Sequence, residues 1–453
     1  MATLEFYFSL PRREDFKRFL IYLLFVANLA GIFFLWSVGS DYYIKNPADG
    51  NIFIAIGRLF GLLGEFFLLI QLVLVGRIRP IERLFGFDRL NKIHRTIGYS
   101  IALFILGHPL LLILGYAEAG GISFFSQLGE FLSNSEYVLL AYLALLLFIF
   151  VIFISLPFVR GRLHYDRWYF THLLIYLAIG LVFPHQLGIA DLRGGAPLYY
   201  WYILNFGVFG VFLSYRFIRP LFLFWRHRFE VAKVVKESPD TWSLYIKGKK
   251  MEKFRFESGQ YANINIFAGG IWWSKHPFSF SAPYDGKMIR FSIKALGDYT
   301  SKIQNVPMGA RVLIDGPLGL FVERTALRNK FLLIAGGIGI TPLRSMVSDL
   351  VFKNKNTVLL YGVKTEKDFV FKREIDDLAE KSELLGVHYV LSSPEPGFES
   401  GYIDKEKIIR LVPDFYEREV FLCGPPLMMN SVVSSLKELG FPKKNIHFEK
   451  FSF

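Results

Sequence analysis

The most constraining feature of this sequence is a series of six long apolar stretches in its first half. Each is long enough to cross the hydrocarbon core of a bilayer as an α-helix, which takes about 20 residues. Polar loops separate the stretches, and no seventh one follows. The sequence therefore predicts six membrane-spanning helices, at approximately 17–38, 52–75, 96–115, 137–157, 169–187 and 199–223.

Composition supports a membrane domain followed by a soluble portion. Of the 453 residues, 53% are hydrophobic and 20% are charged, which is more apolar than an ordinary soluble chain. The apolar runs end near Arg226, so we predict a transmembrane domain over residues 1–224. A single cysteine, Cys423, excludes an intramolecular disulfide framework and a CxxC pair, so a metal site must use other ligands, such as histidine.

Charge in the loops predicts the orientation of the helices. Arg and Lys are concentrated in the loop after the second stretch and in the loop after the fourth, whereas the opposite loops carry few. By the positive-inside rule both termini face the cytoplasm of a multi-pass cell-membrane protein. The net charge of +13 fits anionic lipid headgroups better than nucleic acid, so we expect a lipid bilayer and no nucleic acid among the partners. The first stretch lacks a small-residue cleavage site and is expected to be a retained helix.

Four of the nine histidines lie within or at the edge of the third and fifth stretches. His94 and His108 are 108 − 94 = 14 residues apart, and His172 and His185 are 185 − 172 = 13 apart, or about 21 and 20 Å of helical rise. Both helices cross the membrane in the same direction, so His94 pairs with His172 on the cytoplasmic side and His108 with His185 on the outer side. Each pair can supply both axial ligands of a haem iron, which predicts two haems.

Two considerations bear on this prediction. An ideal α-helix turns by about 100° per residue, so a spacing of 13 residues places His172 and His185 on different faces. We therefore expect a distortion caused by Pro184, together with Gly180 one turn earlier. The alternative role for an intramembrane histidine is an interhelical hydrogen bond. Four histidines at matched depths favour metal binding, because polar groups at such depths are costly and usually functional.

Three other polar residues of the second stretch have weaker assignments. Arg58 could pair with a haem propionate or extend to the outer interface. Glu65 and Gln71 are expected to form hydrogen bonds between helices.

The second half of the sequence divides into two domains. Residues 225–328 contain short alternating strands separated by Gly, Pro and Asp turns, which is typical of a small antiparallel β-barrel. Residues 329–453 alternate between apolar strands and helices, which predicts a doubly wound, Rossmann-like α/β domain with a parallel sheet.

Glycine turns in the α/β domain are candidate nucleotide-binding sites. The first follows an apolar strand and precedes a helix, where backbone amides can receive a pyrophosphate. The alternative is that these glycines only form the turn between the strand and the helix and bind no ligand. The second lies at the carboxyl end of another strand, where such sheets bind ligands. The residues of the two turns are Gly336, Gly337, Gly339, Thr341 and Pro342, and Cys423, Gly424 and Pro425.

With these motifs the chain resembles the NADPH oxidase and ferric reductase family, from about residue 17 to the C-terminus. The run HPFSFS at 276–281, otherwise an edge strand, is similar to the flavin-binding motif of that family. The resemblance implies a ferredoxin-NADP reductase-like module in which this run, IKALGDYT at 293–300 and GPLG at 316–319 hold FAD. The implied FAD-binding residues are His276, Pro277, Phe278, Ser279, Phe280, Ser281, Lys294, Gly297, Asp298, Thr300, Gly316 and Gly319.

The same resemblance covers the remaining motifs. The glycine turns are similar to the nicotinamide dinucleotide segments, the histidine spacings match the haem ligands, and Arg58 matches an arginine near the outer haem. Phe453 is similar to the aromatic residue that covers the flavin ring. Two positions depart from the oxidase members: Leu112 stands where they carry a further histidine, and Ala178 where some carry an aromatic residue between the haems.

Electron counting sets the predicted function. A nicotinamide gives two electrons as a hydride and a haem accepts one, so a flavin must lie between them. We therefore predict a flavocytochrome b type NAD(P)H oxidase with FAD and two haem b groups. It would pass electrons from cytoplasmic NADPH to extracytoplasmic O2, giving superoxide; reduction of a ferric chelate is the alternative. We take Phe453, Cys423 and Arg58 as candidate catalytic residues.

The predictions of nucleotide preference and of regulation rest on fewer sequence features. Lys364 follows the second strand of the α/β domain, where an acidic residue would favour NADH, so we expect NADPH, with NADH possible. A solvated charged turn is the alternative at that position. We expect no obligatory regulatory protein. A transporter that senses nucleotide is disfavoured, because paired broken segments are absent from the sequence.

Overall fold

The computed structural model describes residues 13–134, 136–186, 195–268, 270–271 and 274–449. The chain divides into two compact units, Met1–Tyr215 and Arg216–Phe453. This division falls inside a helical run that ends at His227, so the last helix of the run groups with the second unit. The domain boundaries at 224/225 and 328/329 stay predictions.

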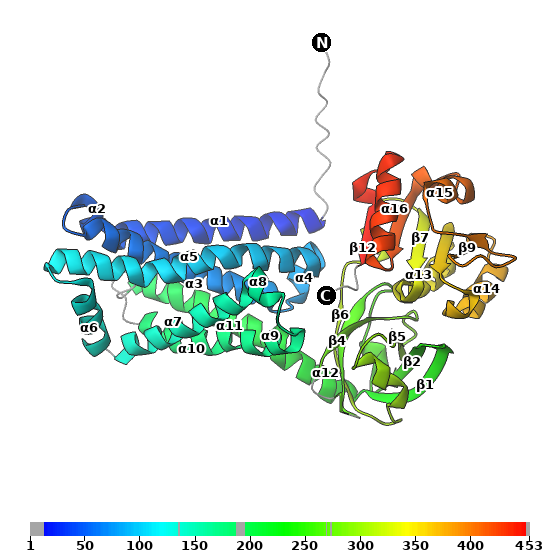
Figure 1. Cartoon of the computed structure of the whole chain (residues 1–453), viewed down its shortest axis with the longest axis horizontal. Helices are drawn as coiled ribbons and strands as arrows, with labels where there is room; N and C mark the ends of the chain where they lie inside the picture. Colours follow the sequence, from blue (N-terminus) through cyan, green and yellow to red (C-terminus); the bar gives the residue numbers. More distant parts are fainter. Residues whose placement is uncertain (1–12, 135, 187–194, 269, 272–273, 450–453) are drawn as a thin grey trace, which may run out of the picture. The chain divides into compact units, whose positions relative to one another are not determined.

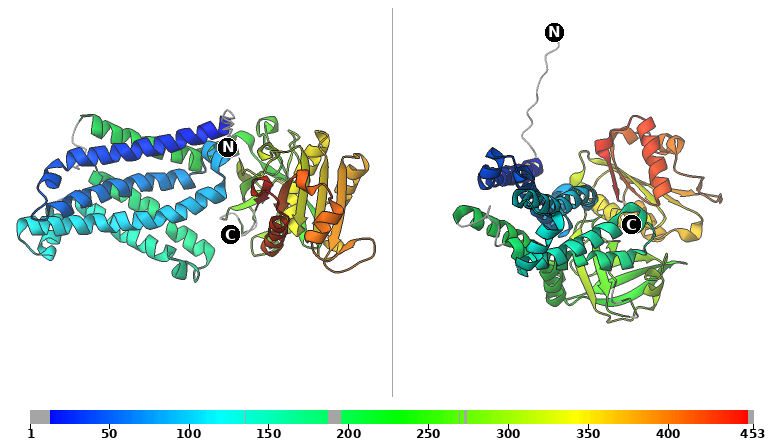
Figure 2. Two further views of the ribbon diagram at one scale, coloured as in Figure 1. Left: turned by 90° about the horizontal axis from the view of Figure 1, so that it is seen from above. Right: turned by 60° about the vertical axis from the view of Figure 1, so that its left-hand side comes forward.

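Helices build the first unit. The long ones are shown side by side in Figures 1 and 2. They are α1 (Arg13–Gly39), α3 (Asn51–Val75), α5 (Phe87–Gly120), α7 (Glu136–Ser155), α10 (Leu174–Gln186) and α11 (Gly195–Leu213), with the shorter helices α2 (Asp41–Lys45), α4 (Arg79–Phe85), α6 (Phe124–Asn134), α8 (Pro157–Arg160) and α9 (Tyr165–His172) between them.

Six helices in the described part of the chain are long and apolar enough to cross a membrane, which confirms the predicted count. They cover Glu14–Gly39, Asn51–Val75, Arg89–Gly120, Tyr137–Ser155, Arg167–Gln186 and Gly195–His227. The third begins earlier than expected. Arg89, Lys92 and Arg95 interrupt the apolar pattern, but charged residues can extend a helix beyond the hydrocarbon core, so the backbone of α5 starts at Phe87.

The central helix of this unit is α3, which packs against α1, α5 and α11. More than half of its most apolar window is buried, whereas large apolar side chains on α1, α7 and α11 are exposed, such as Leu24, Leu146 and Ile203. An exposed apolar surface of this extent is expected where helices face lipid. The first unit is thus organised around α3, with apolar surfaces directed outward.

The second unit begins with α12 (Arg219–His227), which follows a π-helical turn at Ser214–Ile218 and packs on β6. Two three-stranded antiparallel sheets then form the barrel. An isolated bridge between Phe280 and Phe291 links the sheets. The first sheet has the order β1 (Glu230–Ser238), β2 (Thr241–Lys247), β5 (Ile289–Lys294), and the second β4 (His276–Ser279), β3 (Tyr261–Ile266), β6 (Val312–Leu318).

A six-stranded parallel sheet forms the rest of the unit, in the order β10-β9-β8-β7-β11-β12. Alternate residues of β7 enter two cores: Leu333 packs with α13 and α14 on one face, and Leu332 packs with α15 and α16 on the other. The predicted fold class is therefore confirmed. The elements are β7 (Lys330–Gly336), α13 (Ile340–Phe352), β8 (Thr357–Val363), α14 (Lys372–Glu380), β9 (Leu385–Leu391), β10 (Glu399–Ser400), α15 (Lys405–Leu411), β11 (Arg418–Cys423), α16 (Pro426–Glu438) and β12 (Ile446–Glu449).

Candidate functional site

The four predicted histidines meet in two pairs, in the combination expected from their spacing. The ring centroids of His94 on α5 and His172 on α9 lie 6.4 Å apart, with ring planes at 74°. The centroids of His108 on α5 and His185 on α10 lie 6.3 Å apart, with planes at 57°. Each pair joins α5 to the α9–α10 segment.

The spacing of each pair fits one metal ion between the two rings. An imidazole nitrogen binds a metal at about 2 Å and lies roughly 1 Å from its own ring centre, so two imidazoles on opposite sides of one ion have centres about 6 Å apart. Rings stacked face to face can lie much closer, as Phe256 and Phe280 do at 4.0 Å. The pairs therefore have the separation of axial ligands.

Hydrogen bonds from the Nδ1 atoms hold two of these rings in position. Nδ1 of His108 lies 2.8 Å from the carbonyl oxygen of Gly57, and Nδ1 of His172 lies 3.1 Å from Oγ of Ser155. Metal-binding histidines commonly use one ring nitrogen in this way and leave the other for the metal. The buried Nδ1 of His94 has no hydrogen-bond partner among the described residues, and a bound group could use it.

Gly61 on α3 gives the ring of His108 its space. A Cβ at position 61 would lie 2.7 Å from Nδ1 and 2.8 Å from Cε1 of His108. The same face of α3 supplies the Gly57 carbonyl. His108 is therefore oriented by the glycine-rich face of α3 as well as by its own helix.

The helical run between His172 and His185 is interrupted at a residue other than the expected one. Helix α9 ends at His172, Leu173 forms a turn, and α10 starts at Leu174, whereas Pro184 lies inside α10. The turn includes an i→i+3 hydrogen bond from Tyr176 N to Leu173 O. The helix is therefore interrupted beside His172, between the two histidines, and the distortion expected at Pro184 stays a prediction.

The other three residues singled out near the histidines have ordinary packing positions. Leu112 is half-buried on α5, facing Gly57, and Ala178 is fully buried in the apolar core of the helices. Arg58 follows Gly57 on α3, and its guanidinium lies 5.3 Å from the centre of the Tyr43 ring. Arg58 is thus the neighbour in sequence of Gly57, whose carbonyl oxygen bonds to His108.

Glu65 and Gln71 make hydrogen bonds between helices, as predicted. Gln186 on α10 donates to Oε2 of Glu65 at 2.7 Å and accepts from Nε1 of Trp201 at 3.1 Å. Gln71 donates to the carbonyl oxygen of His94 at 2.9 Å. The buried Glu65–Gln186–Trp201 chain links α3, α10 and α11 directly beside His185.

Replacing Gln186 with leucine should destabilise the helical unit. The change leaves the Glu65 carboxyl and the Trp201 indole N–H without their observed partner, at a cost of about 1–3 kcal/mol for each buried group. Thermal unfolding in detergent should show a clear fall in Tm. Gln127→Leu is the matched control, because Gln127 is equally buried but has a 3.4 Å bond within its own helix. Equal falls in the two variants would contradict the prediction.

The predicted flavin segment forms strand β4 and an aromatic stack. The rings of His276 and Tyr299 lie 4.0 Å apart, and those of Phe278 and Tyr299 lie 6.4 Å apart at 21°. Pro277 pairs with Asn263 on β3. The side chain of Tyr299 is buried, and burial raises the pKa of its hydroxyl, so this group stays a neutral donor.

Two hydroxyls of the barrel fit contact with a bound cofactor. The buried side-chain oxygens of Ser279 and Tyr299 have no hydrogen-bond partner among the described residues, and such groups usually find one. By contrast, Phe280 stacks on Phe256 in the barrel core, and Ser281 bonds to Ser292 at 2.8 Å. The last two residues of the motif therefore direct their side chains into the barrel.

The other turns predicted for FAD lie at the ends of strands. Gly297 and Asp298 form an exposed turn after β5, which Thr300 closes by accepting hydrogen bonds from Leu296 N and Gly297 N. Gly316 lies in β6 against Ala262, and Gly319, with φ of 97°, lies against the ring of Tyr261. Phe453 lies outside the described residues, so its proposed position over the flavin stays a prediction.

The two glycine turns of the α/β domain meet. A Cβ on Gly339 would lie 2.5 Å from the carbonyl carbon of Cys423 and 2.7 Å from Gly424 N, and one on Gly336 would lie 2.8 Å from Cδ of Pro425. Gly337 has φ of 52°, which suits glycine. Thr341 and Pro342 are buried in the first turn of α13, so the backbone amides at this helix start lie at the meeting point.

Cys423 contributes a neutral thiol. Burial raises its pKa well above the usual range, with a further contribution from Glu449. The group therefore does not act as a thiolate, the reactive form of cysteine. Cys423 lies at the end of β11, and its backbone closely approaches Gly339. Its predicted catalytic role stays a prediction.

A cleft of about 170 Å³ brings three of the predicted residues together. Lys294 of the barrel, Gly337 of the first glycine turn and Lys364 at the end of β8 all line it. Asp240, which was not predicted, also lines the cleft, and its Oδ2 forms an ion pair with Nζ of Lys294 at 3.1 Å. Although partial burial opposes ionisation, this contact lowers the pKa of Asp240. The cleft thus joins the FAD-binding prediction to the nucleotide-binding prediction.

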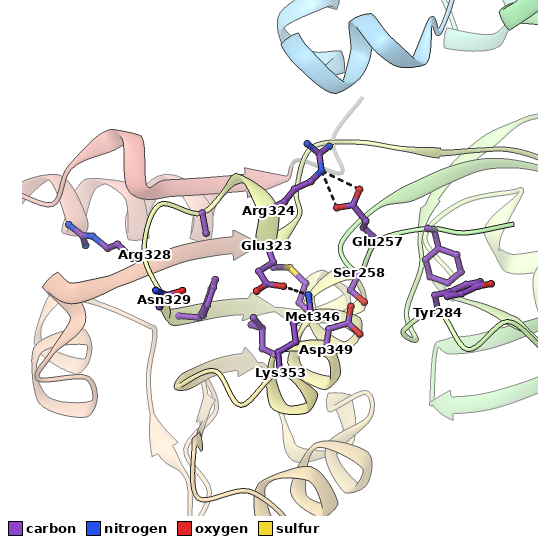
Figure 3. Close-up of a pocket in the computed structure, with 14 residues that line it drawn as sticks. Glu257, Ser258, Tyr284, Glu323, Arg324, Arg328, Asn329, Met346, Asp349 and Lys353 are labelled. Carbon is purple, nitrogen blue, oxygen red and sulfur yellow. Dashed lines mark hydrogen bonds and ion pairs between the residues drawn. The ribbon is translucent and has the colours of Figure 1, made fainter. Parts of the chain in front are cut away.

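A larger cleft of about 510 Å³ lies at the other end of α13 and contains none of the predicted residues (Figure 3). Ion pairs between Arg324 and Glu257 and between Lys353 and Glu323 cross it. Because it is lined by the start of β7 and the second half of α13, it lies away from the glycine turns.

Sequence reasoning missed several residues that support the site. Ser155 and Gly57 bond to histidines, and Asp240 pairs with Lys294. Asp240 lies in the tight turn between β1 and β2, which contains no recognisable motif. The glycines of α3 at 57, 61 and 64 were the available signal, because small residues spaced along an apolar helix indicate close helix contact.

Three family models match the chain in series. The ferric reductase like transmembrane component matches residues 60–183, an FAD-binding domain matches 226–321, and an oxidoreductase NAD-binding domain matches 333–434. The first match contains His94, His108 and His172 and ends two residues before His185. The other two span the barrel and most of the parallel-sheet domain.

Individual relatives match about half of the chain. A glycine betaine monooxygenase reductase subunit of Chromohalobacter salexigens is 29% identical over 50% of this chain and 64% of its own length, and NADH-cytochrome b5 reductase 1 of Dictyostelium discoideum is 29% identical over 42% and 68%. The chain therefore spans less than two thirds of the first relative. The FAD/NAD-binding domain of a Vibrio cholerae nitric oxide dioxygenase aligns at 23% identity over 49% of this chain and 98% of its own, with a TM-score of 0.45.

The fold and the family matches define the class of this protein: a multi-pass, membrane-embedded oxidoreductase with FAD- and NAD-binding domains. The order of its three domains supports a ferric reductase-like or NADPH oxidase-like family.

Proposed function

We propose that this protein passes electrons from cytoplasmic NADPH through FAD and two b-type haems to an acceptor on the other side of the membrane. The observation that carries the proposal is the geometry of the histidines: two imidazole pairs, each with a separation that would suit two ligands of one haem iron, with three of the four histidines inside the ferric reductase like segment. When bound, FAD accepts a hydride from the nicotinamide, and the haems carry single electrons across the hydrocarbon core.

The residues of this chain hold and orient those groups. His94 and His172 would bind one haem and His108 and His185 the other, with Ser155 and Gly57 fixing two of the rings. The hydroxyls of Ser279 and Tyr299 would donate to FAD. The amides at the start of α13 would hold the nucleotide pyrophosphate, because helix N-termini bind anions.

The cytoplasmic position of both termini, with the reductase module on that side, is supported by the basic loops alone. Arg58, near the outer pair, is proposed to bind a haem propionate. We propose that activity needs no regulatory protein. Addition of a cytosolic extract to purified protein in liposomes should therefore leave the rate unchanged, and a requirement for the extract would contradict this part of the proposal.

We propose O2, reduced to superoxide, as the acceptor, with a ferric chelate as the alternative. With two histidines of this chain holding each iron, a haem would have no open coordination site for the acceptor and would supply electrons without binding it. The described residues contain no group of three or more His, Cys, Asp or Glu side chains arranged to hold a metal ion, which does not favour a dedicated site for a ferric chelate.

The acceptor can be determined with the purified protein. NADPH-driven reduction of cytochrome c should be largely abolished by superoxide dismutase, and ferric citrate should be reduced more slowly than O2. Reduction of cytochrome c that is insensitive to the dismutase, together with fast ferric citrate reduction, would show that the ferric reductase alternative holds.

Lys364 is proposed to favour NADPH through the 2′-phosphate. It is exposed at the end of β8 and lines the cleft with Gly337. Lys364→Glu should raise the KM for NADPH by about tenfold or more, as expected for loss of a charge-assisted contact, and should change the KM for NADH little. Lys355→Glu, at the opposite end of the same strand, is the control. Equal changes for both nucleotides would contradict the assignment.

A further inference from the structure

Three charged side chains converge between the barrel and the parallel-sheet domain. Arg290 of β5 binds the carboxylate of Glu374 on α14 with two hydrogen bonds, of 2.7 and 3.2 Å. Arg344 of α13 binds the same carboxylate, with Nε at 3.0 Å and Nη2 at 2.7 Å from Oε2. Both arginine side chains are buried, and Glu374 is partly exposed. We call these three residues the ionic triad.

The triad connects the two segments that were assigned to the cofactors. Arg290 also donates to the carbonyl oxygen of Ser281 at 2.7 Å, and Ser281 ends the flavin segment. Arg344 lies in the first part of α13, the helix that starts at the glycine turn. Glu374 therefore links, through one arginine on each side, the flavin segment to the dinucleotide helix.

The triad is charged and close-packed at neutral pH. Although partial burial opposes ionisation, Arg290 and Arg344 lower the pKa of Glu374. Because this pKa is lowered, the contribution of the Glu374 carboxylate to folding stability is present at pH values above the usual carboxyl pKa. It is lost as the pH falls through the lowered value. The guanidinium of Arg290 also lies 4.3 Å from the centre of the Phe371 ring, which fixes its orientation.

A second contact shows that the domains meet at more than one place. Gly259 N of the barrel donates to Oγ of Ser345 on α13 at 3.1 Å. A Cβ at position 259 would lie 3.1 Å from Sδ of Met346, so barrel and helix approach closely here. Loss of the triad would therefore leave the domains attached, with freedom to change their relative angle.

We infer that Glu374 is a positioning residue that sets the flavin segment against the dinucleotide helix for hydride transfer. The inference rests on the proposed function. Glu374 acts through Arg290 and Arg344 and is assigned no contact with substrate. Hydride transfer is sensitive to such placement, because a displacement of about 1 Å in a reacting pair can slow a reaction about 100-fold.

The test is flavin reduction by NADPH in the full-length protein, followed by stopped-flow absorbance. Glu374→Gln should lower the rate constant at saturating NADPH by about 10- to 100-fold while the Kd for NADPH changes by less than about threefold. Glu374→Asp, which keeps the charge, should recover part of the rate. The long-wavelength absorbance of a nicotinamide lying on the flavin, recorded with NADP⁺ and dithionite-reduced protein, should weaken in parallel.

Asp414→Asn is the matched control. Asp414 holds the buried guanidinium of Arg418 with two hydrogen bonds, of 2.7 and 2.9 Å, entirely within the parallel-sheet domain. If Glu374 has a purely structural role, Glu374→Gln and Asp414→Asn should both lower Tm, and neither should slow flavin reduction at low temperature. That result would overturn the inference. If the wild-type protein binds no FAD or is not reduced by NADPH, the proposed function itself fails, and this outcome is distinct.

Discussion

Replacing His185 with leucine is expected to remove one of two haems and to stop electron transfer to the outer side. The imidazole of His108 would lose its partner at 6.3 Å, and the haem proposed for this pair would keep only one of its two protein ligands. Haem per chain should fall from two to about one, and outward transfer by at least about 100-fold. Haem content is measured as the pyridine haemochrome, and transfer as NADPH-driven cytochrome c reduction.

Flavin reduction by NADPH should be unchanged in this variant, because the parallel-sheet domain and barrel belong to the second compact unit. His164→Leu is the control, since His164 is an exposed residue that precedes α9 and is not part of either pair. Two haems per chain and full outward transfer in His185→Leu would refute the assignment of the outer pair.

The second large effect is expected at Gly339. A methyl group at this position would lie 2.5 Å from the carbonyl carbon of Cys423 and 2.7 Å from Gly424 N. Both atoms belong to backbone, so the two glycine turns must separate, and overpacking of this kind costs about 1–3 kcal/mol. Gly339→Ala should slow NADPH-dependent flavin reduction by about 100-fold, because the amides that receive the pyrophosphate move.

Haem content of Gly339→Ala should stay at the wild-type level, and dithionite should still reduce the haems. Gly386→Ala is the control, because a Cβ there meets only Cγ2 of Val358 at 3.7 Å. Wild-type flavin reduction in Gly339→Ala, measured by stopped-flow, would show that the glycine turns do not form the nucleotide site.

The membrane domain was largely predictable because its signals are local. The length of the apolar stretches predicted six helices, and the similar spacings of the histidines predicted the two pairs, which the structure brings together. The interruption at Leu173 was not predictable, because no proline or glycine marks it. The start of α5 was also misplaced, since charged residues hide a helix that continues beyond the apolar run.

In the second unit, local motifs predicted strands and glycine turns but not the contacts between them. The meeting of Gly339 with Cys423 follows from the order of parallel strands, in which β7 and β11 are neighbours. The ionic triad joins residues 84 positions apart in the chain, and neither Arg290 nor Glu374 belongs to a recognisable motif. Such pairs depend on tertiary packing, which a single sequence does not encode locally.

The number and ligation of haems in the purified protein test the central claim most directly. A dithionite-reduced minus oxidised spectrum should show a b-type signal with two histidine ligands, at two haems per chain, and NADPH should reduce the same signal under anaerobic conditions. Protein that folds and binds FAD but shows no such signal would contradict the account.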